Sequence, residues 1–411
     1  MARFTRDPQQ RDRRSRAFVP TPNNLRVIPG FLRRETVGGA LMLLATVAAL
    51  TWANLAPQAY EAVRQFHVGP LTIQHWATDA LLTVFFFLAG MELKREFVSG
   101  SLSDPKAALV PVVAAMAGMA VPAGIYLAVN ATMAGGHLGG WAVPMATDIA
   151  FALAILAAVG SKLPVALRAF LLTLAIVDDL GAIMVIAVAF TSDLSLGWLA
   201  GALAGGLTWW WLQRRRVDVW WPYVPLFIIT WWCMLSSGVH ATIAGVLLGL
   251  LTRSEAADPH DPVDRWSHFI HPFSAGFVVP VFALMAAGVR ITPGALRDMI
   301  TSPVGLGIVL GLVAGKVIGV FAGAYLTTRF TRATLAPGLR WSEIFAVSVL
   351  AGVGFTVALF VTELAFGTQP EFLERGKAAV LTASVIAAVL ATIILRGRIR
   401  AREAQLFDRL G

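Results

Sequence analysis

Charged residues are scarce in this chain of 411 residues, of which Asp, Glu, Lys and Arg make up only 14%. Soluble globular domains carry about 25% charged residues, so this scarcity excludes an ordinary soluble domain. Apolar residues make up 57% of the chain. They form repeated runs of about 20 residues, the length of helix that crosses a hydrocarbon core. The composition therefore predicts an all-α polytopic membrane protein.

Cysteine is nearly absent. The single Cys233 excludes an intramolecular disulfide, and its apolar surroundings favour a buried small hydrophobe over a reactive thiol. The sequence also lacks any arrangement that resembles a catalytic triad or a thiolate and histidine metal site. We therefore expect no enzyme activity and no cofactor.

The N-terminus lacks the apolar core of a signal peptide. Residues 1–34 are polar and Arg-rich. Organellar transit peptides can begin in the same way, but Asp7, Asp12 and the many apolar runs favour a cytoplasmic bacterial tail. Pro20 and Pro22 predict that this tail is largely disordered.

The basic residues are unevenly distributed along the chain. The net charge of +9 could indicate a nucleic-acid partner, but basic residues gather in the two tails and in alternate loops. With the N-terminus inside, 27 Lys and Arg residues lie on the inner side, and positive loops face the cytoplasm. We therefore expect no nucleic-acid partner. We expect the chain to be surrounded by membrane lipid in a bacterial inner membrane, with both termini on the cytoplasmic side. The outer loops hold five basic residues, Arg64, Arg290, Arg297, Arg375 and Lys377.

Twelve membrane-spanning helices are predicted, in one transporter domain over residues 35–397 that is followed by a cytoplasmic tail over 398–411. The expected spans are 36–55, 75–97, 107–129, 140–159, 164–190, 195–212, 222–235, 239–251, 269–287, 303–328, 342–365 and 372–395. Between the first two, the Gly69-Pro70 break and its β-branched neighbours allow a small hairpin. A plain surface loop is the alternative.

Three carboxylates lie inside two apolar segments, in ATDIAFAL (Asp148) and LAIVDDLGAI (Asp178 and Asp179). Ionisable groups in hydrocarbon are costly and usually mark an ion or proton pathway. Adjacent helical residues point about 100° apart, so Asp178 and Asp179 cannot share a face. One could join Asp148 while the other reaches Lys316. The carboxylates and the Thr147 hydroxyl would form an oxygen-rich shell that suits a hard cation. Protons would compete with the cation for these carboxylates.

Lys316 is the one Lys or Arg in the middle of an expected span, in LVAGKVIGV, whereas the others within expected spans lie close to a span end. An intramembrane lysine needs a partner, and the three aspartates are the candidates. A buried salt bridge and a proton carrier are both open interpretations, and one does not exclude the other.

Helix-breaking residues interrupt two of the expected spans. Pro144 precedes Asp148 in the fourth span, and Gly352 and Gly354 lie in mid-membrane in the eleventh. Proline and glycine are ordinary in membrane helices, because neighbours satisfy the freed backbone groups. Interrupted helices in corresponding positions of two halves, however, indicate a transporter's binding site. An inverted repeat would relate spans 3–5 to spans 10–12, although the sequence trace of it is faint.

Six motifs in order, GMELKRE, ATDIAFAL, LAIVDDLGAI, SGVHATIAGV, AGK and GVGFT, make the chain resemble the NhaA family of sodium/proton antiporters over residues 36–395. The resemblance implies the NhaA-type fold, with inverted repeats and with helices 4 and 11 broken near the midplane. It implies electrogenic exchange of Na⁺ or Li⁺ for protons. Asp178 and Asp179 would bind the transported Na⁺ and the protons, and Asp148 and Thr147 would lie beside them. Asp148 and Lys316 would offset the partial charges of the broken helix ends.

The resemblance also implies regulation and assembly. The family's pH-sensing residues match positions near the cytoplasmic face and in SGVHATIAGV, but Ser267 stands where the family has a glutamate, which leaves the pH set point open. Asp79 matches a family acid that we interpret as structural. The segment between helices 1 and 2 resembles a hairpin that forms homodimers. The expected pH-sensing residues are Glu92, Arg95, Glu96, His240, His268 and His271.

Two other classes remain as alternatives. An intramembrane aspartyl protease also carries paired acids, but the chain has no GxGD segment, and Lys316 would then be unexplained. A cation-coupled solute symporter could use the same broken-helix architecture. Flux of an organic solute with sodium would favour the symporter, and proton flux driven by sodium would favour the antiporter.

Overall fold

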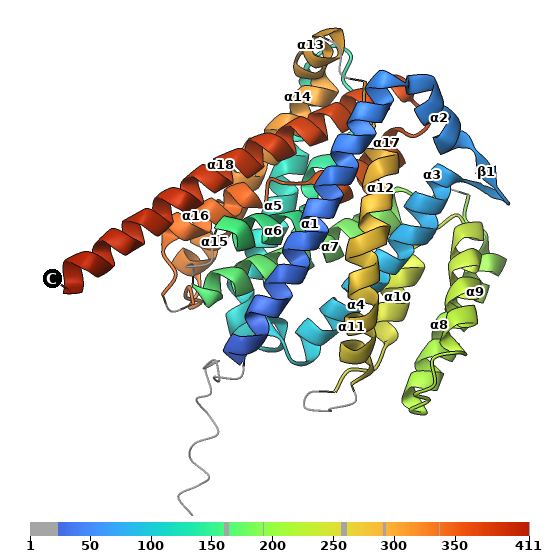
Figure 1. Cartoon of the computed structure of the whole chain (residues 1–411), viewed down its shortest axis with the longest axis horizontal. Helices are drawn as coiled ribbons and strands as arrows, with labels where there is room; N and C mark the ends of the chain where they lie inside the picture. Colours follow the sequence, from blue (N-terminus) through green and yellow to red (C-terminus); the bar gives the residue numbers. More distant parts are fainter. Residues whose placement is uncertain are drawn as a thin grey trace, which may run out of the picture.

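The computed structural model describes residues 24–159, 164–191, 193–255, 261–290, 293–336 and 338–410. This part is almost entirely helical, with one hairpin formed by β1 (His67–Val68) and β2 (Leu71–Thr72) (Figure 1). The α-helices are α1 (Asn24–Leu55), α2 (Pro57–Gln65), α3 (Ile73–His75), α4 (Leu82–Val98), α5 (Pro105–Thr132), α6 (Ile149–Val159), α7 (Val165–Ala189), α8 (Leu196–Arg214), α9 (Tyr223–Ser236), α10 (Thr242–Leu251), α11 (Pro262–Phe273), α12 (Val279–Ala286), α13 (Pro293–Thr301), α14 (Pro303–Leu310), α15 (Lys316–Phe330), α16 (Trp341–Leu350), α17 (Phe355–Phe366) and α18 (Pro370–Leu410).

Short turns of other helix types extend several of these helices. Three π-helical turns, Trp76–Leu81, Ser274–Val278 and Gly311–Gly315, link α3 to α4, α11 to α12, and α14 to α15. A π turn adds a residue to the helical repeat and so changes which face the next residues present. The third of these turns ends directly before Lys316 and therefore sets the direction of that side chain.

Eight helical segments in the described residues are long and apolar enough to cross a membrane, and a bent pair formed by α16 and α17, at 45°, would make nine. The spans expected at 195–212, 222–235 and 239–251 coincide with α8, α9 and α10. However, α9 and α10 have only 14 and 10 residues, and a straight span needs about 20. Length and apolarity alone thus support eight or nine spans rather than twelve.

Both ends of the described chain are helical. Helix α1 begins at Asn24, so residues 24–34 of the expected disordered tail belong to this helix, while residues 1–23 lie outside the described part. Its apolar window, Val37–Leu55, matches the first expected span. Helix α18 continues past residue 398 to Leu410, through the expected C-terminal tail.

The segment between the first two spans forms the expected hairpin. Strands β1 and β2 pair antiparallel, with His67 opposite Thr72 and Val68 opposite Leu71. Gly69 in the turn has a φ of 65°, a left-handed conformation that glycine adopts without steric cost. The alternative of a plain surface loop is wrong.

Two spans are interrupted where the sequence predicts. In the fourth span, a 3₁₀ turn (Val143–Met145) that contains Pro144 is followed by non-helical residues 146–148, and then by α6. In the eleventh span, residues 351–354 separate α16 from α17. The expectation that helices 4 and 11 are broken is therefore confirmed.

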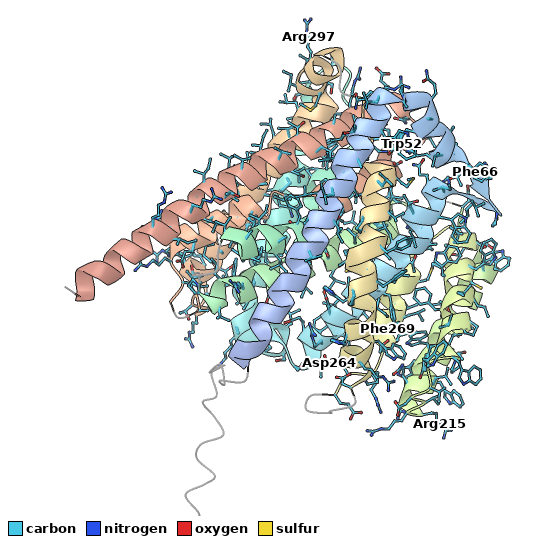
Figure 2. All side chains as sticks on the ribbon, viewed as in Figure 1. Trp52, Phe66, Arg215, Asp264, Phe269 and Arg297 are labelled. Carbon is cyan, nitrogen blue, oxygen red and sulfur yellow. The ribbon has the colours of Figure 1, made fainter. Side chains whose placement is uncertain are left out.

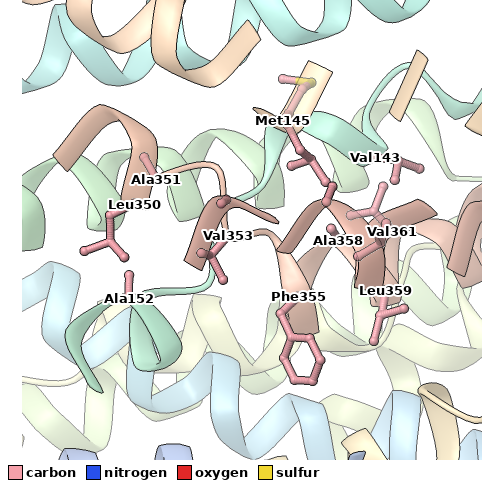
Figure 3. Packing of buried hydrophobic residues seen from close by; sticks show 14 of the residues in the cluster. Val143, Met145, Ala152, Leu350, Ala351, Val353, Phe355, Ala358, Leu359 and Val361 are labelled. Atoms are coloured by element: carbon pink, nitrogen blue, oxygen red, sulfur yellow. The ribbon is translucent and has the colours of Figure 1, made fainter. Parts of the chain in front are cut away.

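The two interruptions lie against each other. The Asp148 amide donates to the Val353 carbonyl at 2.7 Å, and the Thr147 hydroxyl donates to the Ala351 carbonyl at 2.8 Å. A Cβ on Gly354 would come within 3.1 Å of the Ala146 carbonyl oxygen, so glycine permits this close approach. Apolar side chains from both segments pack around the crossing, as Figure 3 shows. Backbone groups freed by one break are thus satisfied by the other.

The flanks and ends of the molecule differ in polarity. Large apolar side chains such as Phe269 are exposed on the flanks, as expected for lipid contact. Figure 2 shows Arg215 and Asp264 at the end where the described α1 begins, and Arg297 at the opposite end. We call these the α11 end and the α13 end, after the helices near them in Figure 1.

Candidate functional site

Asp178 and Lys316 form a fully buried ion pair between α7 and α15. The Lys316 Nζ lies 2.8 Å from Oδ1 and 2.7 Å from Oδ2 of Asp178, and the two side chains are 1% exposed or less. Both carboxylate oxygens are therefore occupied by one ammonium group. Two ions out of water persist only with such close pairing. Of the two adjacent aspartates, Asp178 is the one that reaches Lys316.

Asp148 lies at the crossing and binds the N-termini of two helices. Its Oδ1 accepts from the Phe151 amide of α6 at 2.9 Å. Its Oδ2 accepts from the Thr356 amide of α17 at 3.0 Å and from the Thr356 hydroxyl at 2.6 Å. A carboxylate at a helix N-terminus satisfies free amides and opposes the positive end of the helix dipole. Asp148 thus lies where a carboxylate can offset the ends of both broken helices, the role that the resemblance implies for it.

Asp179 differs from the other two carboxylates. It is 5% exposed, and its Oδ1 has no hydrogen-bond partner. A buried polar atom without a partner is costly, so this oxygen is a ready acceptor for a proton, a cation or water. Because Asp179 is one helical position beyond Asp178, it faces away from Lys316.

A cavity of about 100 Å³ leads away from Asp179. It passes Glu92 of α4 and reaches Arg95 and His271 near the α11 end. One water molecule needs about 10–15 Å³ of cavity volume, so this cavity has room for several water molecules. A smaller cavity also joins Asp179 to Glu92. Asp179 can thus exchange ligands with one end of the molecule.

The described residues contain no group of three or more His, Cys, Asp or Glu side chains that could hold a metal ion. A hard cation at Asp179 would therefore complete its shell with carbonyl, hydroxyl or water oxygens. Thr147 lies beside Asp178 and is fully buried. Its hydroxyl donates its hydrogen to the Ala351 carbonyl, so only the lone pairs of the hydroxyl oxygen remain for binding a cation.

The residues expected to sense pH fall into two groups. Glu92, Arg95 and His271 line the cavity, and Glu96 beside them accepts from the Ser101 amide and hydroxyl at 2.8 and 2.9 Å. Arg95 also lies 3.5 Å from Asp264 of α11, the helix that carries His268. The Ser267 hydroxyl oxygen, at the position that departs from the family pattern, is buried without a hydrogen-bond partner.

His240 belongs to the second group and does not line the cavity. Its Nε2 lies 3.6 Å from Asp79, its Nδ1 lies 2.9 Å from the Thr242 hydroxyl, and its ring packs on Phe360. Asp79 is buried and its backbone carbonyl accepts from the Trp231 indole, which fits the structural role expected for it.

Several charged or polar contacts were missed by sequence reasoning. Thr356 holds Asp148, and it ends the GVGFT motif, so its place directly after the glycine break was a usable signal. Glu363 of α17 is paired with Lys377 of α18 and Arg64 of α2. Lys377 is 3% exposed and lies in α18 together with Arg375, so the assignment of these two residues to an outer loop is wrong. An acidic residue inside an apolar run was the available signal for Glu363.

Comparison with known proteins extends over nearly all of the chain. A family model described as Na+/H+ antiporter 1 matches residues 30–395. The chain is 58% identical over 380 residues to the Na(+)/H(+) antiporter NhaA of Cutibacterium acnes, covering 92% of this chain and 90% of that protein. It is 55% identical over 377 residues to the Na(+)/H(+) antiporter NhaA 3 of Streptomyces coelicolor, with 89% and 79% covered. For the Na(+)/H(+) antiporter NhaA of Mycolicibacterium smegmatis the identity is 50% over 392 residues, with 92% and 90% covered.

Proposed function

The chain belongs to the Na+/H+ antiporter 1 family, and from this premise we propose that it exchanges Na⁺ or Li⁺ for protons by competition at buried aspartates. It is a multi-pass bacterial membrane protein. The observation that carries the proposal is the Asp179 carboxylate, buried with one oxygen unpartnered and joined to a cavity. Such an oxygen can hold either a proton or a cation, which is the requirement for exchange.

The four ionisable residues of the site take different roles in this proposal. Asp179 is the carboxylate at which the cation and the proton compete. Asp178 is the second cation ligand, reached when the cation displaces Lys316, and the released Lys316 can then lose a proton. Asp148 holds the crossing together. Exchange is electrogenic because two groups, Asp179 and the Asp178–Lys316 pair, can bind protons where one cation binds.

The size of the cavity supports an ion over an organic solute. Sites for small organic molecules measure about 300–1,000 Å³, and the cavity at Asp179 is about 100 Å³. This argues against the symporter alternative, which requires space for a solute beside the cation.

The proposed architecture has twelve spans, with α8, α9 and α10 completing the set, and inverted repeats that relate spans 3–5 to spans 10–12. The α11 end is cytoplasmic, as are both termini, because the basic residues concentrate on that side. Residues 1–34, 35–397 and 398–411 are the tail, the transporter domain and the C-terminal tail. The cavity from Asp179 then opens to the cytoplasm.

We also propose that exchange is regulated by pH at the cytoplasmic mouth of the cavity. Glu92, Arg95 and His271 line this cavity, so a change in their charge alters the potential that a cation meets on entry. Glu96, His268 and His240 act from neighbouring positions.

The proposed partners are membrane lipid and a second copy of the chain. The hairpin has short strands with an unpaired edge, and Phe66 before β1 and Val68 within β1 are 62% and 49% exposed. An exposed edge of this kind can pair with the same edge of another copy.

The test is exchange in everted membrane vesicles. Added Na⁺ should dissipate a preformed pH gradient with the wild-type protein, and Asp179→Asn should abolish this response. Asp193→Asn is the matched control, because Asp193 is exposed and its positive φ suits asparagine as well as aspartate. Retained exchange in Asp179→Asn would remove this residue from the mechanism, and a gradient dissipated only with an organic solute present would favour the symporter.

A further inference from the structure

A second set of buried charges lies toward the α13 end, away from the cavity mouth. Glu363 of α17 binds Lys377 of α18, and Arg64 of α2 lies with its Nη2 3.5 Å from the Glu363 Oε1. The side chains of Arg64, Glu363 and Lys377 are 10%, 9% and 4% exposed. Figure 1 shows α2 and the start of α18 at this end of the molecule. Nothing in the proposed exchange mechanism so far uses these three charges.

One face of α17 connects this cluster with the ion site. Thr356, Phe360 and Glu363 are spaced i, i+4 and i+7, so they lie on one side of the helix. The Thr356 hydroxyl donates to Asp148, and Glu363 pairs with the side chains of Arg64 and Lys377. Between them Phe360 is 1% exposed and packs against Phe86 of α4 and Phe282 of α12.

The two sides of the site therefore differ. Toward the α11 end a cavity leads to Asp179, whereas along α17 toward the α13 end an aromatic layer is followed by the Arg64–Glu363 ion pair. Exchange across a membrane requires that a site open to one side and then to the other. For the site to open toward the α13 end, α17 and α2 must part.

The charges are arranged so that this separation leaves no ion alone. When Arg64 and Glu363 part, Glu363 keeps Lys377, and Arg64 keeps Glu61, which its Nη1 contacts at 2.8 Å on the same helix. Partial burial acts to raise the pKa of Glu61, but hydrogen bonds from Gln65 and Arg64 outweigh it and leave that pKa below its usual value. Glu61 is thus ionised at neutral pH. A static brace does not need a spare partner on each side, whereas a contact that opens and closes does, because an orphaned buried charge is costly.

We propose that the Arg64–Glu363 ion pair, backed by Phe360, is the external gate of the transporter, closed while the site faces the cytoplasm and opened when it faces outward. The gate rests on the proposed antiport. Arg64 and Glu363 are positioning residues, since neither touches the ion site. Weakening the pair should raise the fraction of molecules that face outward, and strengthening it should lower that fraction.

The experiment compares the apparent KM for Na⁺ on the two faces, in right-side-out and everted vesicles. Apparent affinity scales with the fraction of molecules in the binding-competent state, so a weaker gate lowers the external KM. Arg64→Met should lower it about fivefold or more and leave the internal KM within about twofold. Arg64→Lys keeps a positively charged side chain, so its apparent KM for Na⁺ should stay within about twofold of the wild-type value on both faces. Arg375→Met is the matched control, because Arg375 pairs with Glu371 on its own helix.

A second variant acts in the opposite direction and leaves both members of the buried pair, Arg64 and Glu363, in place. Glu61 is half exposed, and Glu61→Gln removes the partner to which Arg64 retreats. The gate should then close more firmly, and the external KM should rise about two- to threefold. An unchanged external KM in either Arg64→Met or Glu61→Gln, or equal changes on both faces, would overturn the gate. Absence of any Na⁺- or Li⁺-driven proton movement in the wild type would instead overturn the antiport itself.

Discussion

An aspartate lies at the crossing of the broken helices and another lies on the cavity wall, but their carboxylates are bonded in opposite ways. At the crossing, the Asp148 oxygens receive three hydrogen bonds from two helix ends. On the cavity wall, one Asp179 oxygen receives none. A buried carboxylate that is fully bonded contributes to stability, whereas one left unpaired costs free energy. The difference indicates which acid maintains the fold and which is kept free for a ligand.

The Asp178–Lys316 pair shares features of both regions, because it is fully bonded and yet can be opened by a cation. Both of its oxygens are bound by the Lys316 ammonium, a side-chain group that can move away when a cation arrives. Breaking a buried pair by removing one partner costs about 3–5 kcal/mol, while replacing both partners by neutral groups costs far less.

The largest expected effect on stability follows from that asymmetry. Lys316→Met leaves Asp178 as a buried charge and should lower the free energy of unfolding by about 3–5 kcal/mol. The double variant Lys316→Met/Asp178→Asn should recover most of the loss. Thermal unfolding of the purified proteins in detergent measures both. A double variant as unstable as Lys316→Met would mean that the pair does not determine the stability of this region.

A smaller loss is expected at the crossing. Asp148→Ala removes the caps of α6 and α17, each worth about 1 kcal/mol, so unfolding should become easier by about 2 kcal/mol. Asp148→Asn should cost about half as much, because the amide oxygen still caps one helix. If Asp148→Ala unfolds at the same temperature as the wild type, the crossing is held by its other contacts instead.

The smallest effect on stability is expected where the effect on exchange is greatest. Asp179→Asn removes a buried charge with an unpaired oxygen, so the free energy of unfolding should not fall. Na⁺ should raise the unfolding temperature of the wild type by mass action but leave that of Asp179→Asn unchanged. A strongly destabilised Asp179→Asn would place this residue with Asp148, as part of the fold.

The sequence was sufficient to find the acids and Lys316, because ionisable residues in apolar runs are visible without a structure. It also located both helix breaks and the hairpin turn from proline and glycine. It could not decide which aspartate faces Lys316. The 100° rule separates two faces but does not say which one points inward, and the π turn before Lys316 changes the register without a sequence signal.

Contacts between distant charges were also beyond sequence reasoning. Arg64 and Glu363 are 299 residues apart, and Lys377 lies close enough to a span boundary to be assigned to a loop. The count of twelve spans depended on α8, α9 and α10, which are not among the eight or nine segments that pass by length and apolarity, and α9 and α10 are shorter than a straight span. Short apolar helices of this kind carry a weak signal of length.

Proton release on Na⁺ binding is the most direct test of the claim that cation and proton compete at Asp179. Purified protein in weakly buffered detergent solution should acidify the medium when Na⁺ is added, and K⁺ should serve as the control. We expect the wild type and Asp193→Asn to release protons and Asp179→Asn to release none. Proton release by Asp179→Asn equal to that of the wild type would contradict this claim.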